Sequence, residues 1–373
     1  MRILLILFSK CLIPFSLILL FSCNSGMNAL HLPANTPTVE HYGRTVYDDN
    51  KGLVLIGSAS YAELSFTGDS CIIFLKNIAN PGDYNYVSIE IDDTYEGRLK
   101  IDGENQQRFV IHPQKAAATH LLRIYKATES HNGQVVLSGV KAKRLNNTTH
   151  PSRKKIEFIG NSITAGMAND TKDIPCGTGK WYDQHNAYWA YGPRVARALN
   201  ADFLLSAVSG IGIYRNWNSD GPVMPDVYES AYLEIDSVQR RDFTQFSPDV
   251  VSICLGTNDF SDGDGKTARL PFDSSIYIRQ YVAFLGTVYK HYPSCQVALL
   301  TSPMLNGNKA AMMLACLETV KGRAKDVYPG KPVIEIFRFE PMVPKGCSYH
   351  PDIADHEVMA NQLIPFLRRL LER

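Results

Sequence analysis

The chain has 373 residues, of which 45% are hydrophobic and 20% are charged, so it has room for about two globular domains of ordinary size. Its formal net charge of +1 at pH 7 argues against a partner bound mainly by electrostatics, such as duplex DNA, because that binding needs clustered Lys and Arg. We therefore expect a neutral enzyme or binding module that has no nucleic acid partner.

The first residues have the pattern of an export signal. Arg2 precedes an apolar run at 3–8, and after Lys10 a second apolar run covers 12–21. A positive start, an apolar stretch and a small residue before Cys23 are typical of a secretory signal. The alternative is a transmembrane helix, since the run is nearly long enough to span a bilayer.

The tetrapeptide Leu-Phe-Ser-Cys that ends at Cys23 resembles a bacterial lipobox, in which this cysteine is lipidated and becomes the new N-terminus. We expect a signal peptide of the lipoprotein type at 1–23 and a linker at 24–40. The protein is then exported, as an outer membrane lipoprotein or into the periplasm or to the cell surface. Its only membrane contact would be this N-terminal anchor.

The region 41–147 is predicted to consist of β-strands. Short apolar or alternating runs are separated by turn residues such as Gly68-Asp69 and Asn132-Gly133. Several strands at this spacing indicate an all-β sandwich, here of the jelly-roll type. Its role is either that of a packing partner or that of a sugar-binding accessory. The predicted strands are 62–66, 71–75, 86–91, 108–111, 121–125 and 135–140.

After a polar connector at 145–151, strands alternate with helices. Continuously apolar strands in this arrangement indicate a parallel sheet covered on both faces, so we expect an α/β domain at 152–373. Functional groups of such sheets gather in the loops past the carboxyl ends of the strands. The predicted strands are 155–159, 202–208, 249–255, 296–301 and 333–337, and the predicted helices are 187–199, 274–292, 309–326 and 356–372.

Ser162 directly follows the first of these strands and precedes a helical segment. A hydroxyl at this position lies near helix N-terminal amides, which suits a nucleophile whose reaction generates an oxyanion. The alternative is that Ser162 only caps the helix. The surrounding run is not G-x-S-x-G, which argues against the nucleophile elbow of α/β-hydrolases.

The next two strand ends supply candidate oxyanion donors. Gly210 can present an unobstructed backbone N–H, and the side-chain amide of Asn258 is a neutral donor. Each has a structural alternative, a tight turn for the glycine and an Asx-turn for the asparagine. His350 stands where the last loop enters the final helix, and its imidazole can accept the serine proton. A lone loop histidine is otherwise an ordinary surface residue.

Four blocks in this chain order resemble the SGNH, or GDSL, hydrolase superfamily: Gly160-Asn161-Ser162, Gly210, Gly256-Thr257-Asn258-Asp259 and His350-Pro351. The similarity covers roughly 155 to the end, and four ordered blocks are much more specific than one. The resemblance implies an SGNH-type three-layer hydrolase domain. It also implies that Ser162 is the nucleophile, that His350 is its base, and that the Ser162 amide, Gly210 and Asn258 form the oxyanion hole.

The preceding β-sandwich, with its stretch at 121–140, is similar to carbohydrate esterase family 2, whose members deacetylate plant polysaccharides such as xylan and glucomannan. This resemblance implies an acetyl esterase that acts on acetylated polysaccharide through an acetyl-serine intermediate, without metal or cofactor. Two other functions stay open. One is a lipid-directed GDSL esterase or lysophospholipase, and the other is a glycan-binding lipoprotein whose enzyme domain has decayed.

The sequence departs from the superfamily pattern at two places. Asn161 replaces the usual Asp beside the nucleophile, which is nearly isosteric. The acid expected two or three residues before the histidine is missing, because Ser348 and Cys347 stand there. A backbone carbonyl can also accept the Nδ1 proton and fix the tautomer. We therefore predict a Ser-His dyad in which a main-chain carbonyl near Ser348 orients His350.

In a variant of this prediction, Asp352 or Asp355 folds back onto the imidazole, which Pro351 makes awkward. Aromatic residues offer a surface for sugar rings: Tyr349 adjoins His350, and the loops after the first two strands carry Trp181, Tyr182, Tyr214 and Trp217. Each of these rings could instead serve packing.

The chain has eight cysteines, none of which forms a CxxC pair or a zinc-like spacing with histidine. Cys254 lies in an apolar run and is predicted to be a reduced core residue. Other cysteines of an exported protein can pair, but the sequence leaves the pairing open.

Overall fold

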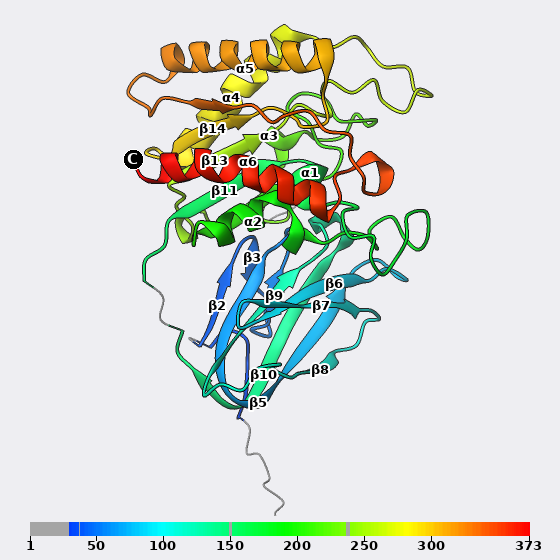
Figure 1. Ribbon diagram of the computed structural model, residues 1–373, viewed down its shortest axis with the longest axis vertical. Helices are drawn as coiled ribbons and strands as arrows, with labels where there is room; N and C mark the ends of the chain where they lie inside the picture. Colours follow the sequence, from blue (N-terminus) through cyan, green and yellow to red (C-terminus); the bar gives the residue numbers. More distant parts are fainter. Residues whose placement is uncertain (1–29, 37, 149–150, 236–238) are drawn as a thin grey trace, which may run out of the picture.

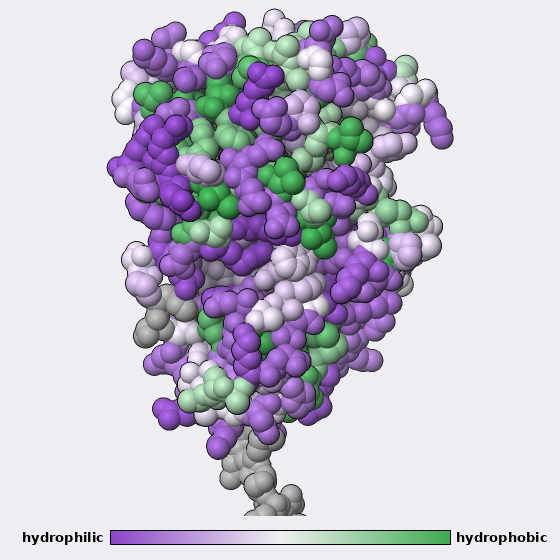
Figure 2. All heavy atoms as spheres, viewed as in Figure 1, coloured by the Kyte–Doolittle hydropathy of each residue, from purple (hydrophilic) through white to green (hydrophobic). Residues whose placement is uncertain are grey.

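The computed structural model describes residues 30–36, 38–148, 151–235 and 239–373, which form two domains stacked along the long axis (Figure 1). The predictions for the signal peptide and for lipidation of Cys23 lie outside the described residues. Within the described part, no helix is both long and apolar enough to cross a membrane. On the face shown in Figure 2, hydrophobic residues form small groups between hydrophilic ones.

The N-terminal domain is one antiparallel sheet of ten strands that encloses a single core. Two long strands, β5 (Tyr61–Ile78) and β10 (Gln134–Asn146), pair with each other and with most of the remaining strands. Inward-facing side chains from most of these strands meet in one buried cluster, as expected for a sheet that folds over itself. The other strands are β1 (Leu30–Leu32), β2 (Val39–Tyr42), β3 (Thr45–Tyr47), β4 (Leu53–Leu55), β6 (Asn85–Ile91), β7 (Thr94–Ile101), β8 (Gln107–Ile111) and β9 (His120–Lys126).

The all-β prediction is confirmed, but two of its details are wrong. Gly68-Asp69 is not a turn, because β5 runs through it; opposite, the register with β10 shifts around Lys143, so this position is a β-bulge. The predicted linker also contributes structure, since β1 pairs with β10 and β2 with β5. Short strands such as these bury too few residues to show a period in the sequence.

The C-terminal domain is a five-stranded parallel sheet in the order β12-β11-β13-β14-β15, covered on both faces. Helices α2 and α6 pack on the face toward the N-terminal domain, and α4 and α5 pack on the other (Figure 1). The strands are β11 (Lys155–Gly160), β12 (Asp202–Ala207), β13 (Val250–Cys254), β14 (Gln296–Leu300) and β15 (Glu335–Phe337). The helices are α1 (Ser162–Ala165), α2 (Tyr191–Ala198), α3 (Met224–Val227), α4 (Ser274–His291), α5 (Gly307–Val327) and α6 (Ile353–Leu371).

The three-layer fold is confirmed, and the boundaries differ at helix ends. The predicted helix 187–199 is a 3-10 turn, η2 (Ala187–Trp189), followed by α2, because Ala190 has extended backbone angles. The last helix begins earlier than predicted, at Ile353, because Asp352 caps it by accepting the N–H of Asp355.

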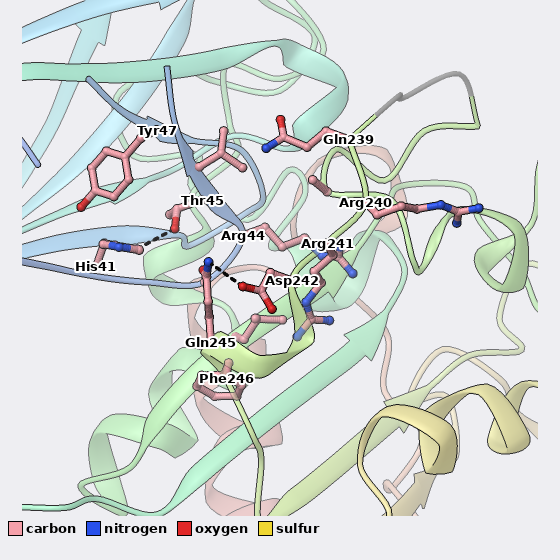
Figure 3. A pocket seen from close by; sticks show the side chains of 14 residues that line it. His41, Arg44, Thr45, Tyr47, Gln239, Arg240, Arg241, Asp242, Gln245 and Phe246 are labelled. Atoms are coloured by element: carbon pink, nitrogen blue, oxygen red, sulfur yellow. Dashed lines mark hydrogen bonds between the residues drawn. The ribbon is translucent and has the colours of Figure 1, made fainter. Parts of the chain in front are cut away.

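The two domains meet through a buried arginine. Arg44, in the β2–β3 turn of the N-terminal domain, is 3% exposed and donates to the Ser206 hydroxyl and to the carbonyls of Tyr228 and Ser230. The Ser206 hydroxyl in turn donates to Glu157 in β11 (2.6 Å). Figure 3 shows Arg44 beside a cavity of about 190 Å³ that is lined by both domains. Because a buried charge needs partners, this contact fixes the domains in one relative position.

Candidate active site

Ser162 opens the short helix α1 at the carboxyl end of β11, which lies between β12 and β13 in the sheet. The helix is capped by Asn161, whose side chain accepts the N–H of Ile163 (3.1 Å), so the serine hydroxyl is free for another contact. The turn requires a glycine before it, since a Cβ at Gly160 would lie 2.0 Å from Oγ1 of Thr164. Ser162 is 7% exposed.

His350 reaches this serine from the other end of the chain. Its Nε2 lies 2.8 Å from Oγ of Ser162, and its Nδ1 lies 2.8 Å from the carbonyl oxygen of Ser348. Since a carbonyl only accepts, Nδ1 carries the hydrogen and Nε2 is free to accept the serine proton. The nearby carboxylates are engaged elsewhere: Asp352 caps α6, and Asp355 accepts the N–H of Lys345 (2.8 Å).

The carbonyl of Ser348 points at the imidazole because the backbone turns sharply in η4 (Cys347–Tyr349). Ser348 and Tyr349 both have left-handed angles, with φ of 51° and 58°. Such angles are uncommon for residues other than glycine and persist only where the surroundings hold them. Three contacts do so here: Gly346 donates to the carbonyl of His350 (2.7 Å), Cys347 donates to that of Ala168 (3.0 Å), and a disulfide joins Cys347 to Cys176.

The disulfide connects the histidine turn to the long loop after α1, from Met167 to Asn186. The N-terminal domain forms hydrogen bonds with this loop. Arg98 of β7 donates to the carbonyls of Asp183 and His185 (both 2.8 Å). Tyr84 and Tyr86 donate to the Asp183 carboxylate. The position of His350 therefore depends on both domains.

The pairing of the cysteines was left open by the sequence, and the structure joins Cys176 to Cys347. The remaining cysteines of the described part, Cys71, Cys254, Cys295 and Cys316, are free and buried, as expected for Cys254.

Gly210 and Asn258 follow the two strands that flank β11, so their loops adjoin that of Ser162. Gly210 has a φ of +77° with open space where a Cβ would stand. Asn258 is 7% exposed and uses one amide hydrogen on the carbonyl of Ile211 (2.8 Å). Its second amide hydrogen is available to a ligand.

Burial lowers the pKa of His350 below its usual value of 6.5, and the carbonyl of Ser348 opposes this shift only in part. His185 lowers this pKa further and Glu129 raises it. The imidazole is therefore neutral at pH 7 and able to act as a base. The participation of Glu129, which belongs to the N-terminal domain, left no signal in the sequence.

The five candidate aromatic residues differ in their surroundings, and Tyr182 is buried, at 3% exposed, with its hydroxyl donating to Asp83 (3.0 Å). Tyr349 is 85% exposed, and Trp181, 49% exposed, stands edge-on to the His185 ring. Trp217, 46% exposed, lines a cavity of about 320 Å³ together with Gly210. Tyr214 instead packs against Phe272 and accepts the N–H of Asp273, and it lines a different cavity. Within the described ranges, no group of His, Cys, Asp and Glu could hold a metal ion.

Two family models match the chain, one for each domain. The carbohydrate esterase 2 N-terminal domain matches residues 41–151, and the GDSL-like lipase/acylhydrolase family matches residues 158–357, which is more than half of the chain.

The relatives agree with both matches. Two proteins of Cellvibrio japonicus, each named acetylxylan esterase/glucomannan deacetylase, are 25% identical over 97% of this chain and 99% of the relative, and 28% identical over 83% and 84%. A family two carbohydrate esterase from Clostridium thermocellum, solved with cellohexaose, superposes with a TM-score of 0.78 at 27% identity and covers 90% of this chain and 99% of that one. The chain belongs to the GDSL-like lipase/acylhydrolase family and carries in front of it the N-terminal domain of carbohydrate esterase family 2.

Proposed function

We propose that this protein is a serine esterase that removes O-acetyl groups from plant polysaccharides such as xylan and glucomannan. The observation that carries the proposal is the continuous chain of two 2.8 Å contacts from the Ser348 carbonyl through the His350 imidazole to the Ser162 hydroxyl. The acetyl esterases among the relatives supply the substrate class.

In the proposed reaction, Oγ of Ser162 attacks the acetyl carbonyl carbon while Nε2 of His350 takes the hydroxyl proton. The negative charge that forms on the carbonyl oxygen is stabilised by the backbone N–H groups of Ser162 and Gly210 and by the amide of Asn258. The imidazolium then protonates the sugar oxygen, which leaves as a free hydroxyl. Water, activated by the same imidazole, hydrolyses the acetyl-serine and releases acetate.

The Ser348 carbonyl does part of the work of a triad acid. It fixes the tautomer, but as a neutral group it does not stabilise the imidazolium as a carboxylate would. We propose that the exposed ring of Tyr349, beside the histidine, stacks on a sugar ring, and that Trp217 and Trp181 contact further sugar rings of the polymer. We assign Tyr214 to packing.

We further propose that the protein is exported through the signal at 1–23 and held at the membrane by lipidation of Cys23. An export route suits a polymeric substrate that lies outside the cell. It also suits the Cys176–Cys347 disulfide, which forms in oxidising compartments.

The first test measures acetate released from acetylated xylan, from glucomannan and from aryl esters of increasing acyl length. We expect release from both polymers, preference for acetyl over longer esters, and loss of activity in Ser162→Ala. Activity that grows with acyl length would indicate a lipid esterase, and failure of an organophosphonate to label Ser162 would leave only glycan binding.

The second prediction concerns pH. Because His350 must be neutral to accept a proton, kcat/KM falls as the pH drops through its pKa, and burial holds that pKa below 6.5. We expect the acid limb of the kcat/KM profile to lie below pH 6.5. An acid limb above this value would contradict the proposed environment of the base.

The third prediction concerns the missing acid. Since the Ser348 carbonyl already binds Nδ1, a carboxylate added by Ser348→Asp finds no proton to accept, and we expect no rise in kcat. Ser348→Asn, of equal size, is the control for changes in the turn. A clear rise in kcat for the aspartate variant alone would show that the dyad lacks an acid.

The fourth prediction concerns the disulfide. In the double variant Cys176→Ser/Cys347→Ser the histidine turn loses one of its three anchors, so we expect kcat to fall while KM changes little. Removal of a disulfide also lowers stability, typically by about 2–4 kcal/mol, so the rates are compared well below the unfolding temperature. Cys254→Ser, at a free buried cysteine, serves as the control; equal kcat in the double variant and the wild type would refute the role.

A further inference from the structure

Glu129 lies where the N-terminal domain touches the loop of the second oxyanion donor. It precedes the 3-10 turn η1 (Ser130–Asn132) and is 1% exposed. One carboxylate oxygen accepts the backbone N–H of Ser209 (2.7 Å), and the other accepts the Ser209 hydroxyl. Ser209 directly precedes Gly210, so a carboxylate from one domain anchors the turn that presents the oxyanion donor of the other.

The contact continues toward the nucleophile. The Ser209 hydroxyl lies 3.2 Å from Sδ of Met167, and the N–H of Met167 donates to the carbonyl of Ser162 (3.0 Å). Through Ser209, Glu129 is thus connected to both the loop of Gly210 and the loop that follows Ser162.

Glu129 also faces a second imidazole. Its Oε1 lies 3.3 Å from Nε2 of His185, a fully buried ring whose Nδ1 accepts the N–H of Ala168 (3.3 Å). Nε2 is thus the ring nitrogen of His185 that faces the Glu129 carboxylate.

Another charged neighbour is Lys126, whose Nζ donates to the backbone carbonyl of Glu129 (2.5 Å) and to Thr128. Burial lowers the pKa of Lys126 to about 7, and the charge of Glu129 opposes this shift. Burial alone would raise the pKa of Glu129, but the contacts with His185 and Ser209 outweigh it and lower this pKa. Glu129 is therefore an anion at pH 7.

Resting on the proposed esterase function, we infer that Glu129 is a positioning residue of the active site: it holds the Ser209–Gly210 turn in place for the oxyanion. The charge of this buried carboxylate also raises the pKa of His350. The N-terminal domain is then part of the catalytic apparatus.

The charges around His350 set the sign of the test. Burial lowers the pKa of His350 most and His185 lowers it further, whereas the carbonyl of Ser348 and the charge of Glu129 raise it; the pKa of His356 is lowered by burial, by Arg194 and by His350. Removing the charge in Glu129→Gln, which keeps the size of the side chain, should therefore lower the pKa of His350. The acid limb of kcat/KM moves to lower pH, a change that a merely structural role would not produce.

We expect Glu129→Gln to lower kcat on an aryl acetate by about 10- to 100-fold, with KM little changed, because the lost alignment acts in the transition state. Ser209→Ala removes one anchor but leaves the charge, so we expect a smaller fall in kcat and an unmoved acid limb. The matched control is Glu90→Gln. Glu90 is also a buried glutamate of the N-terminal domain at the interface, where it accepts the Tyr188 hydroxyl (2.6 Å), but it does not contact the Ser209 turn. Its kcat and acid limb should match those of the wild type.

A Glu129→Gln enzyme with wild-type kcat and acid limb would overturn the inference. If that variant does not fold, wild-type kcat in Ser209→Ala does so instead. The pH dependence of Ser162 labelling by an organophosphonate provides a readout without turnover. A wild-type protein that is labelled but releases no acetate refutes the proposed function, while the labelling profiles of the variants still decide the role of Glu129.

Discussion

Charged groups that are buried between the two domains constrain the whole structure. Arg44, Glu129 and Arg98 extend from the N-terminal domain into the hydrolase domain, and each finds its hydrogen-bond partners there. An unpaired buried charge is far more costly than an exposed one, so these groups tolerate only one arrangement of the domains. The interface therefore does more than cover apolar surface: it fixes positions in the loops above the parallel sheet.

The catalytic geometry depends on this fixation because His350 has no carboxylate partner. Its orientation rests on a carbonyl in a turn with two consecutive left-handed residues, which needs outside support. The support passes from Arg98 through the loop before Asn186 to the Cys176–Cys347 disulfide. Cys347 stands at one of the two positions where the superfamily usually places its acid. The histidine turn is therefore held by a disulfide bond at a position where the superfamily usually has a carboxylate that binds the histidine.

This arrangement gives the β-domain a definite role. The sequence left open whether it is a packing partner or a sugar-binding accessory. The contacts of Arg98 and Glu129 indicate that it packs, and that its packing shapes the active site. A GDSL-type domain without such a partner would have to hold the same loops by its own residues.

Much of the architecture follows from the sequence alone. Strand-helix alternation and continuously apolar strands predicted the parallel sheet. Because the carboxyl ends of parallel strands share one edge, the four ordered blocks were predicted to place Ser162 and His350 together at that edge. The replacement of the acid by a carbonyl was also predictable, since no carboxylate precedes His350 at the usual spacing. The sheet follows from local periodicity and a general rule of topology, whereas the missing acid is recognised only through the resemblance to the superfamily.

Only the tertiary structure decided the rest. The bulge at Gly68, the partner of Cys347, and the roles of Glu129 and His185 depend on residues that are distant along the chain: Cys176 and Cys347 are 171 positions apart, and Glu129 and Ser209 are 80 apart. No period or motif records such pairs, because a single glutamate or cysteine looks the same whether it faces water or a buried partner. Its partner exists only once the two domains have packed together.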